Sequence, residues 1–318
     1  MPSPDNRNGP AARAARGREG ASLVLVLCAA GVLLTLSLGA AALAAGRARR
    51  AEDALLRAAL RDGAREAVFR AAEALCADTN GVDHLGEAWA LASTEAEEAL
   101  AHGGDGTFVR IGDECARLAF PASGEAALAA LLAEAGGADA AVARGMAHSI
   151  FLRRRELEET AAADPGAATN GVFAAEEELL AVPVEDPAAL ARALPFLSVR
   201  PDAAIGANTA PRETVVALAL AAGASREGAE GVWARLQMAR GRGDVFETTD
   251  MAEALKLLRG EGDVPTAAEI EALQLLKPRL RVGSDLFRIE ATARRGHVAV
   301  RAECVWDRDA RRILRWVE

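Results

Sequence analysis

Tyrosine is absent from the sequence, and aromatic residues make up only 4% of its 318 residues. Hydrophobic residues still reach 51%, but many of them are alanines, which bury little area each, so leucine and valine must form most of the core. The net charge of −9 disfavours a broad nucleic-acid surface, because phosphate contacts need clustered lysine and arginine. The tryptophans are too scattered for a stacking platform and are expected in the core: Trp89, Trp233, Trp306 and Trp316.

Sequence signatures of enzymes are missing as well. There is no G-x-S-x-G, H-E-x-x-H, Walker A or Rossmann pattern, and no histidine has a cysteine or carboxylate partner at ligand spacing. The four cysteines form no C-x-x-C pair. Cys115 and Cys304 fall in predicted strands, where they either form a disulfide or remain buried thiols. We therefore predict a protein without catalytic residues and without a cofactor.

Charged residues are lacking over one long stretch, from Gly20 to Gly46. A helix of that length covers roughly 40 Å, more than the ~30 Å hydrocarbon core of a bilayer. The small residues of Ala40–Gly46 leave a cleaved secretory signal open, but such a signal has a shorter apolar region of about 7–15 residues. We favour a membrane anchor. Both flanks are basic, so loop charge orients the anchor only weakly.

The helical pattern continues beyond this stretch. No proline or pair of glycines interrupts the chain from Ala21 to about Cys76, and turn-forming residues follow from Asp78 to Gly81. The sequence therefore predicts one long helix, with its first half in lipid and its second half packed on a soluble domain. The apolar face of the second half recurs at three- and four-residue spacing: Leu56, Leu60, Ala64, Ala67, Ala71 and Leu75.

The remaining chain predicts a domain of the α+β class. Alternation between Phe108 and Phe120 predicts two short strands around Asp113 and Glu114, and a helical pattern runs from Glu125 to about Leu276. Three antiparallel strands are predicted at the end: Leu286–Ala293, His297–Trp306 and Arg312–Val317. In the middle strand, one face is apolar (Val298, Val300, Ala302, Cys304, Trp306) and the other carries Arg301, Glu303 and Val305.

The helical stretch has a weak internal repeat, in which Phe173 and Phe246 each precede a short acidic helix. The segment Asn208–Pro211 offers an N-cap candidate with proline just inside the next helix. Two small helical modules are therefore expected. The predicted organisation is a basic leader (1–20), a transmembrane helix (21–46), a helix with the first strands (47–121), an inserted α-helical domain (122–279) and a β-meander (280–318).

Several short strings occur in a fixed order along the chain. The first is the strand string "DECARL", with Asp113, Glu114, Arg117 and Leu118, and the second is "NGVFAAEEELLAV", with Asn170, Phe173 and Glu177. A later link carries Asn208, Thr209, Ala210 and Pro211, and "RVGSDLFRIEA" (281–291) returns to the sheet. Together, and in this order, these strings resemble the general secretion pathway protein K family, minor pseudopilins of the bacterial type II secretion system.

The resemblance implies a pilin-like fold: a long N-terminal transmembrane and amphipathic helix on a small antiparallel sheet, with a large helical insertion. It implies a chain anchored once in the bacterial inner membrane, with its bulk in the periplasm, at the tip of the pseudopilus. The implied partners are the I- and J-type minor pseudopilins, the major pseudopilin, the prepilin peptidase and secreted cargo, with no nucleic acid.

At the N-terminus, the basic leader that ends in glycine resembles a prepilin peptidase site. The implied cut lies between Gly20 and Ala21, with Ala21 as an N-methylated first residue. The fifth position after the cut is Leu25, where ordinary pilin-like subunits carry a glutamate that pairs with a neighbour's terminal amine. A subunit without that carboxylate has no charge to match with a subunit ahead of it, which suits the filament tip.

Two positions depart from the family. Cys115 occupies the place of an expected glycine, and the segment before the first module, Ser149–Glu159, is basic and then rich in glutamate. A calcium site by analogy with pseudopilins would have to use oxygens such as those of Glu158, Glu159 and Asp164. Their spacing matches no known loop, so a solvated acidic face is favoured.

Two other functions stay open. The second module also resembles a helix-hairpin-helix, whose turn binds a DNA phosphate through backbone N–H groups. The corresponding turn, Ala221–Ala229, keeps only Gly223 of the glycine pattern and carries Glu227 beside Arg226. The other open function is that of a minor pilin in a related type IV pilus, because the two kinds of machinery share these parts.

The cleavage site gives a direct prediction. Replacing Gly20→Val should block processing, because the peptidase needs glycine before the cut. N-terminal sequencing of the membrane-bound chain should find a start at Ala21 in the wild type and an intact leader in the variant. Normal processing of the variant, or a wild-type start near Arg47, contradicts the assignment.

Overall fold

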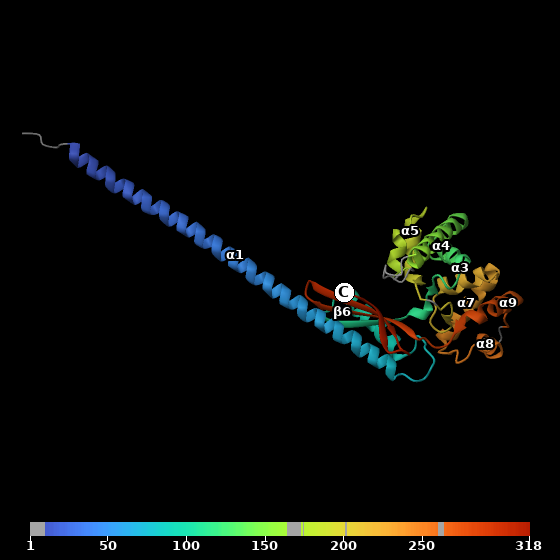
Figure 1. Ribbon diagram of the computed structural model, residues 1–318. Helices are drawn as coiled ribbons and strands as arrows, with labels where there is room; N and C mark the ends of the chain where they lie inside the picture. The colour runs from blue at the N-terminus through green and yellow to red at the C-terminus, as the bar shows by residue number, and fades with distance from the viewer. Residues whose placement is uncertain (1–9, 164–172, 174, 201, 260–263) are drawn as a thin grey trace, which may run out of the picture. The chain divides into compact units, whose positions relative to one another are not determined.

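The computed structural model describes residues 10–163, 173, 175–200, 202–259 and 264–318 (Figure 1). The chain divides into two units, which meet between Ala59 and Leu60 and are described separately. Asn170 and Asp164, which the sequence singles out, lie outside the described residues.

The first unit is formed by helix α1, which begins at Pro10 and continues into the second unit as far as Ala77. From Leu23 onward it is long and apolar enough to cross a membrane, and its large apolar side chains between Leu23 and Leu43 are exposed. Such exposure is costly in water but favourable in lipid, so this unit is compatible with a single-pass anchor. The predicted uninterrupted helix is confirmed, and Gly20 and Ala21 lie inside it.

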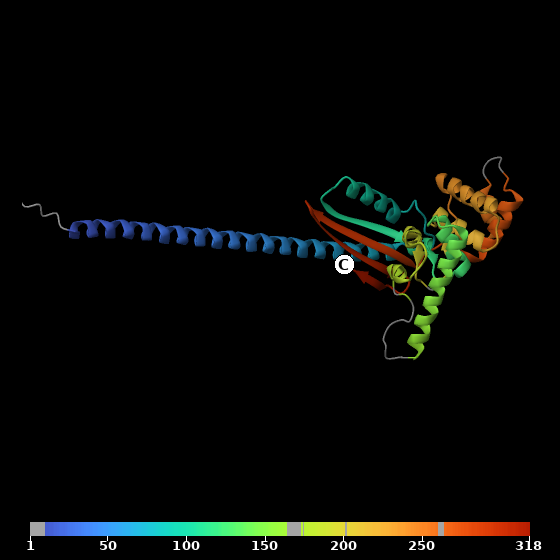
Figure 2. The same ribbon diagram turned by 90° about the horizontal axis from the view of Figure 1, so that it is seen from above.

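The second unit contains a four-stranded antiparallel sheet of order β1-β6-β7-β8 (Figure 2). Its strands are β1 (Gly106–Asp113), β6 (Leu286–Arg295), β7 (Val298–Asp307) and β8 (Arg312–Val317). The three predicted C-terminal strands are thus confirmed, and the first strand of the chain joins them at the edge. Helix α2 (Ala88–Ala101), which the sequence pattern did not indicate, lies beside β1, where Ser93 Oγ accepts from Ile111 N at 2.7 Å.

The last turns of α1 cover one face of this sheet. Ala64, Val68, Ala72 and Leu75 recur along one side of the helix and are almost fully buried. They pack on a matching apolar set from the strands: Phe287, Ile289, Ala291, Ala293, Ala302 and Cys304. The predicted apolar face of β7 is therefore right for Val298, Ala302 and Cys304, but Glu303 on the other face is buried as well, at 8% exposed.

Helices between β1 and β6 form the inserted helical part, and Figure 1 shows them gathered at one end of the sheet. The α-helices are α3 (Glu125–Glu134), α4 (Ala140–Ala163), α5 (Pro187–Ala193), α6 (Arg212–Ala221), α7 (Arg226–Gly241), α8 (Met251–Leu258) and α9 (Ala267–Leu276). The 3-10 helices are η1 (Glu114–Ala116), η2 (Glu176–Ala181), η3 (Leu194–Phe196) and η4 (Lys277–Arg279). Short parallel pairs join distant segments: β2 (Leu118–Ala119) with β3 (Leu197–Ser198), and β4 (Ile205–Gly206) with β5 (Leu280–Arg281).

One apolar cluster runs through all of these helices, so the two expected modules share a core. One local expectation is confirmed and another is wrong. The acidic segment after Phe173 forms a short helix, η2, of the 3-10 type. Neither Asn208 nor Thr209 caps α6, whose N-cap residue is Pro211, because both side chains bond elsewhere.

Candidate functional site

The strand motif lies where β1 leaves the sheet and enters the helical part. Asp113 is the last residue of β1, and its side chain accepts a hydrogen bond from Cys115 N at 2.7 Å, which caps η1. Thr209, from the link before α6, donates its hydroxyl to the same carboxylate. Gly206 is required beside this bond, because a Cβ there would collide with Thr209 Oγ1. Asp113 therefore ties the end of the sheet to the second helical module.

Burial raises the pKa of Asp113, against the lowering effect of its hydrogen bonds from Thr209, Ser284 and Cys115. Arg200 is the cation that also lowers it, but its guanidinium bonds backbone oxygens: Nη2 lies 2.7 Å from Ala204 O and 2.9 Å from Arg117 O. Arg200 is 5% exposed, and it also donates to Cys115 O. This buried arginine therefore joins the backbone of η1 and of the residue after it to the backbone just before β4.

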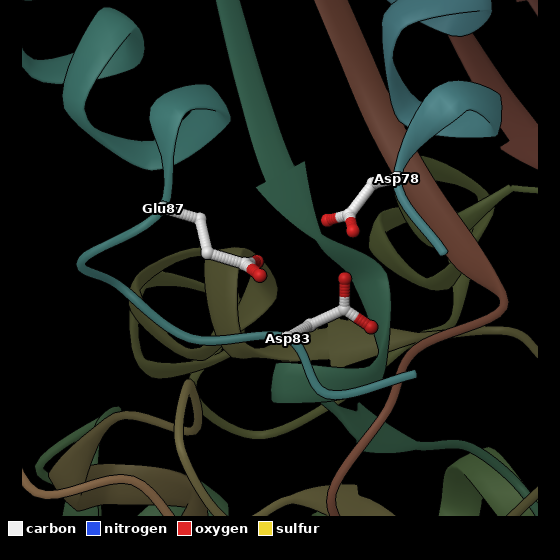
Figure 3. Close-up of side chains that lie close together, drawn as sticks. All are labelled: Asp78, Asp83 and Glu87. Atoms are coloured by element: carbon white, nitrogen blue, oxygen red, sulfur yellow. The ribbon is translucent and has the colours of Figure 1, made fainter. Parts of the chain in front are cut away.

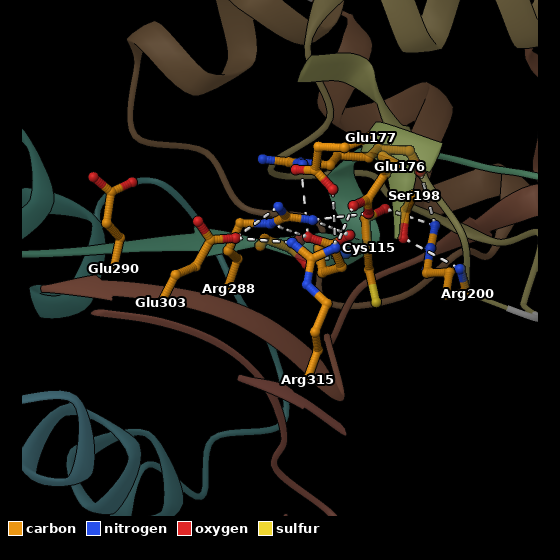
Figure 4. Close-up of polar contacts among 12 residues, drawn as sticks. Cys115, Glu176, Glu177, Ser198, Arg200, Arg288, Glu290, Glu303 and Arg315 are labelled. Carbon is orange, nitrogen blue, oxygen red and sulfur yellow. Dashed lines mark hydrogen bonds and ion pairs between the residues drawn. The ribbon is translucent and has the colours of Figure 1, made fainter. Parts of the chain in front are cut away.

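Glu114 begins an ionic cluster of three carboxylates and three guanidinium groups (Figure 4). Arg288 on β6 lies at its centre: Nε is 3.0 Å from Glu114 Oε2, Nη2 is 2.8 Å from Glu176 Oε1, and Nη1 is 2.9 Å from Glu303 Oε1. Arg315 on β8 binds two of the same carboxylates: Nη1 is 2.7 Å from Glu176 Oε2, and Nη2 is 3.0 Å from Glu303 Oε1. We call this set the ionic cluster: Glu114, Arg117, Glu176, Arg288, Glu303 and Arg315.

The cluster is electrically balanced and mostly out of water. Burial alone would raise the pKa of Glu114, which is 2% exposed, but Arg117 and Arg288 outweigh it and hold that pKa at about 2. Burial likewise opposes ionisation of Glu303, yet Arg288, Arg301 and Arg315 lower its pKa. Burial also lowers the pKa of Arg117, against the opposite effect of Glu114. The groups therefore stay charged at neutral pH and hold one another in place.

This arrangement can position segments but not carry out chemistry. Each carboxylate of the cluster accepts from, or lies within 4.0 Å of, at least one guanidinium, so none is poised as a base or nucleophile. It brings η1, η2 and three strands of the sheet to one point. Removing one partner of such a buried pair typically costs about 3–5 kcal/mol, because the other charge stays buried without a counterion.

The helical-module motif has the same kind of role. The side-chain amide of Asn208 is buried and bonds both Phe246 O at 3.0 Å and Phe246 N at 2.8 Å. Arg240 of α7 donates to Ala207 O and Ala210 O, both at 2.9 Å, and burial lowers its pKa to about 10. Asn208 and Ala210 are therefore parts of a joint between the link, α7 and the segment before α8.

The remaining motif residues are placed as follows. Phe173 is buried against Phe120, with ring centroids 5.8 Å apart, and Leu118 is buried where β2 pairs with β3. Glu177 is exposed, 3.6 Å from Arg315. Leu25 lies on α1, in the other unit, at 72% exposed. Within the second unit, the structure thus brings Asp113 together with Thr209, and Glu114 with Arg117.

The sequence pattern did not single out Arg288, Arg315 and Glu176 of the ionic cluster, nor the buried arginines Arg200 and Arg240. A signal existed for two of them, because Arg288 and Arg315 occupy polar positions of predicted strands, and both pair with Val305, two residues from Glu303 on β7. Only the register shows that these positions meet.

The cysteines are free, so the disulfide left open for Cys115 and Cys304 does not form. Cys115 Sγ is 3.2 Å from Asp285 Oδ1, while Cys304 packs in the helix–sheet core. Burial raises the pKa of both thiols to about 12, which keeps them protonated and unreactive. Of the oxygens considered for calcium, Glu158 is paired with Arg154 at 2.6 Å.

The hairpin between α6 and α7 exists, with Gly223 at φ +99° and Ser225 as the N-cap of α7. The arginine of the turn is already engaged: Arg226 bonds Glu134, and its Nη1 lies 3.6 Å from Glu230, a carboxylate that Arg212 also binds. Glu227 adds an exposed negative charge. The geometry therefore does not favour phosphate binding at this turn.

The ionic cluster predicts a stability loss in acid. The native pKa of Glu114 is lowered, so its contribution is complete above its ordinary value of about 4.3 and is lost as the pH falls toward about 2. Glu114→Gln should lower the free energy of unfolding at pH 7 by about 3 kcal/mol and flatten its decline in that window.

The measurement is chemical denaturation of the detergent-solubilised full chain between pH 7 and pH 2.5. The matched control is Glu97→Gln, which removes an exposed pair with Arg110 and should cost less than about 1 kcal/mol. Equal losses in the two variants would show that the cluster does not stabilise the junction.

Comparisons with known proteins give one result on the fold. No family model matches the chain, and no curated protein does. Among solved structures, the chain is similar to a chain of the crystal structure of the GspK–GspI–GspJ complex from the type 2 secretion system of enterotoxigenic Escherichia coli. The TM-score is 0.54 at 14% identity, over 85% of this chain and 98% of that chain. The fold is therefore pilin-like with a helical insertion, which confirms at the level of fold the resemblance carried by the sequence strings.

Proposed function

We propose that this chain is a minor pseudopilin of a type II secretion system, of the K type. The observation that carries the proposal is the fold shared with a chain of the GspK–GspI–GspJ complex, helical insertion included. The apolar part of α1 supports it independently, because a pseudopilin waits in the inner membrane before it assembles. The role is one of assembly and not of catalysis.

In this role the chain joins the I- and J-type minor pseudopilins, and the three together initiate the filament that drives cargo through the outer membrane. The prepilin peptidase removes residues 1–20 beforehand, and Ala21 becomes the methylated first residue. Helix–helix packing in lipid is favoured by small residues, which this span contains at Gly31, Ser37, Gly39 and Ala40.

Two features support a place at the filament tip. Leu25 offers no carboxylate to the amine of a subunit ahead of it. The helical part has seven α-helices among the described residues. The ionic cluster and the Asp113–Thr209 bond attach it to the end of the sheet. A part of this size prevents another subunit from stacking above it. The major pseudopilin then follows below, and cargo contacts the helical part.

The proposal predicts a secretion defect that depends on the helical part. In a strain that lacks this chain, cargo should stay in the periplasm, and the wild-type gene should restore its release. A variant that lacks residues 125–276 should insert in the membrane but not restore release. Cargo activity in the medium and membrane fractionation are the two measurements. Full release with the shortened chain contradicts a role for the insertion.

The tip position predicts the effect of Leu25→Glu. A glutamate with no amine ahead of it stays unpaired in lipid, which costs about 2–3 kcal/mol, so incorporation and secretion should both fall. The isosteric uncharged variant Leu25→Gln is the control and should have a smaller effect. If Leu25→Glu instead spreads the chain along the filament, as seen by labelling, the chain is not confined to the tip.

A further inference from the structure

An apolar groove of about 660 Å³ lies between the end of α1, helix α2 and strand β1. Alanines line both helical walls, Ala71 and Ala74 on α1 and Ala88 and Ala92 on α2. Their side chains are too short to fill the space between the helices, so the groove stays open, with Val109 of β1 in its lining. Ala74 and Ala92 are exposed. The groove thus offers room for larger apolar side chains from outside.

One end of the groove is acidic, because Asp78 and Glu87 belong to its lining. Figure 3 shows these two carboxylates turned toward each other and toward Asp83, with one oxygen of each within 4.8 Å of the others. Asp83 is neutralised by Arg308, which donates to both of its oxygens at 2.9 and 2.8 Å. The groove lining also contains Arg70, whose Nη2 lies 3.6 Å from Glu66 Oε1 on the same helix. With Asp78 and Glu87 against this one arginine, the lining remains net negative.

Neither of these two carboxylates forms a salt bridge with a lysine or arginine among the described residues, although Arg308, which is bonded to Asp83, also attracts Asp78. Glu87 is only 9% exposed and accepts hydrogen bonds from Asn80 Nδ2 and Trp89 Nε1, both at 2.6 Å, while His84 Nε2 is 3.9 Å away. Asp78 accepts a hydrogen bond from Asn80 N at 3.1 Å. Helix α1 ends beside them at Ala77 with no basic residue in its last turn, so the negative end of its dipole adds to their field.

We propose that this groove docks an amphipathic helix of a neighbouring pilin-like subunit, whose apolar side chains fill the alanine-lined space and whose lysine or arginine reaches Asp78 and Glu87. The inference rests on the proposed function for the identity of the partner. Charge complementarity selects the occupant: covering the groove removes Glu87 and Asp78 from water, and that is unfavourable unless the covering helix brings a cation.

A metal ion fits the acidic end less well. Calcium takes six to eight oxygen ligands. The cluster has three carboxylates, and both oxygens of Asp83 are already bonded by Arg308 and by Ser284 N at 2.6 Å. The adjoining walls are apolar and supply no further oxygen atoms in the number required.

The test measures binding of the full-length, detergent-solubilised chain to the I- and J-type minor pseudopilins of the same bacterium. Ala92→Phe fills the groove and should weaken binding by about tenfold or more. Asp78→Asn with Glu87→Gln keeps the shape, and should weaken binding and reduce its dependence on salt. The controls are Ala141→Phe and Glu227→Gln, on exposed positions of α4 and α7, and should bind as the wild type does. Thermal unfolding verifies that every variant is folded.

A photo-crosslinking amino acid at position 92 should give an adduct with an apolar helical peptide of one partner that carries a lysine or arginine, and the same probe at position 141 should not. Replacing that basic residue by glutamate should weaken binding in the wild type but not in the variant without the two carboxylates.

Unchanged binding of the groove variants overturns the inference and leaves the proposed function standing. A wild-type chain that binds neither partner overturns both. Titration of the chain alone with CaCl2 completes the test: binding that Glu87→Gln abolishes assigns the acidic end to a metal and overturns the inference.

Discussion

The pairing of Glu114 with Arg288 is the interaction on which the rest of the second unit depends. A carboxylate removed from water is tolerated only with a counterion, and Glu114 is 2% exposed. The counterion comes from β6, which follows the helical part in the chain, so the pair requires that the chain return to the sheet in one register. Arg288 also binds Glu176 and Glu303, so the same constraint fixes η2 and β7. Alternative registers of β6 would leave several buried charges unpaired.

A second joint explains why the motif residues cluster where they do. Asp113 receives Thr209, and Asn208 beside it bonds both backbone groups of Phe246. These bonds use side chains with fixed numbers of donors and acceptors. They join segments that the short parallel pairs β2–β3 and β4–β5 connect only over two residues each. The motif residues thus connect the sheet firmly to the helical modules, which the short parallel strand pairs alone do not do.

The sequence predicted the elements better than their junctions. The long helix, the strands from Leu286 onward and the helical insertion follow from periodicity, which is local along the chain. Helix α2 was not indicated, because its buried residues are alanines, Ala90 and Ala96, which give no strong apolar stripe. Glu303 was placed on the face opposite the apolar one, and it is buried as well. Arg288 and Arg315 bond both Glu303 and Glu176 of η2, which lies more than a hundred residues earlier in the chain, and no local pattern records such a contact. The sequence therefore predicted half of the candidate site: it indicated the acidic and polar motif residues but not the arginines that bind them.

The two groups of acidic residues differ in a way that bears on assembly. In the ionic cluster three carboxylates meet three guanidinium groups, so the junction is complete within the chain and needs nothing from outside. At the end of α1, Asp83 is balanced by Arg308, but neither Asp78 nor Glu87 forms a salt bridge of its own with a lysine or arginine in the described part of the chain. A partly buried pair of like charges beside an open apolar groove is unfavourable for the isolated chain and favourable for a chain covered by a basic amphipathic helix. One physical rule, that a buried charge needs a counterion, applies at both places. In the ionic cluster the counterions belong to the chain itself and stabilise it. At the groove a counterion has to come from another subunit, and this need favours binding of a neighbour over exposure to solvent.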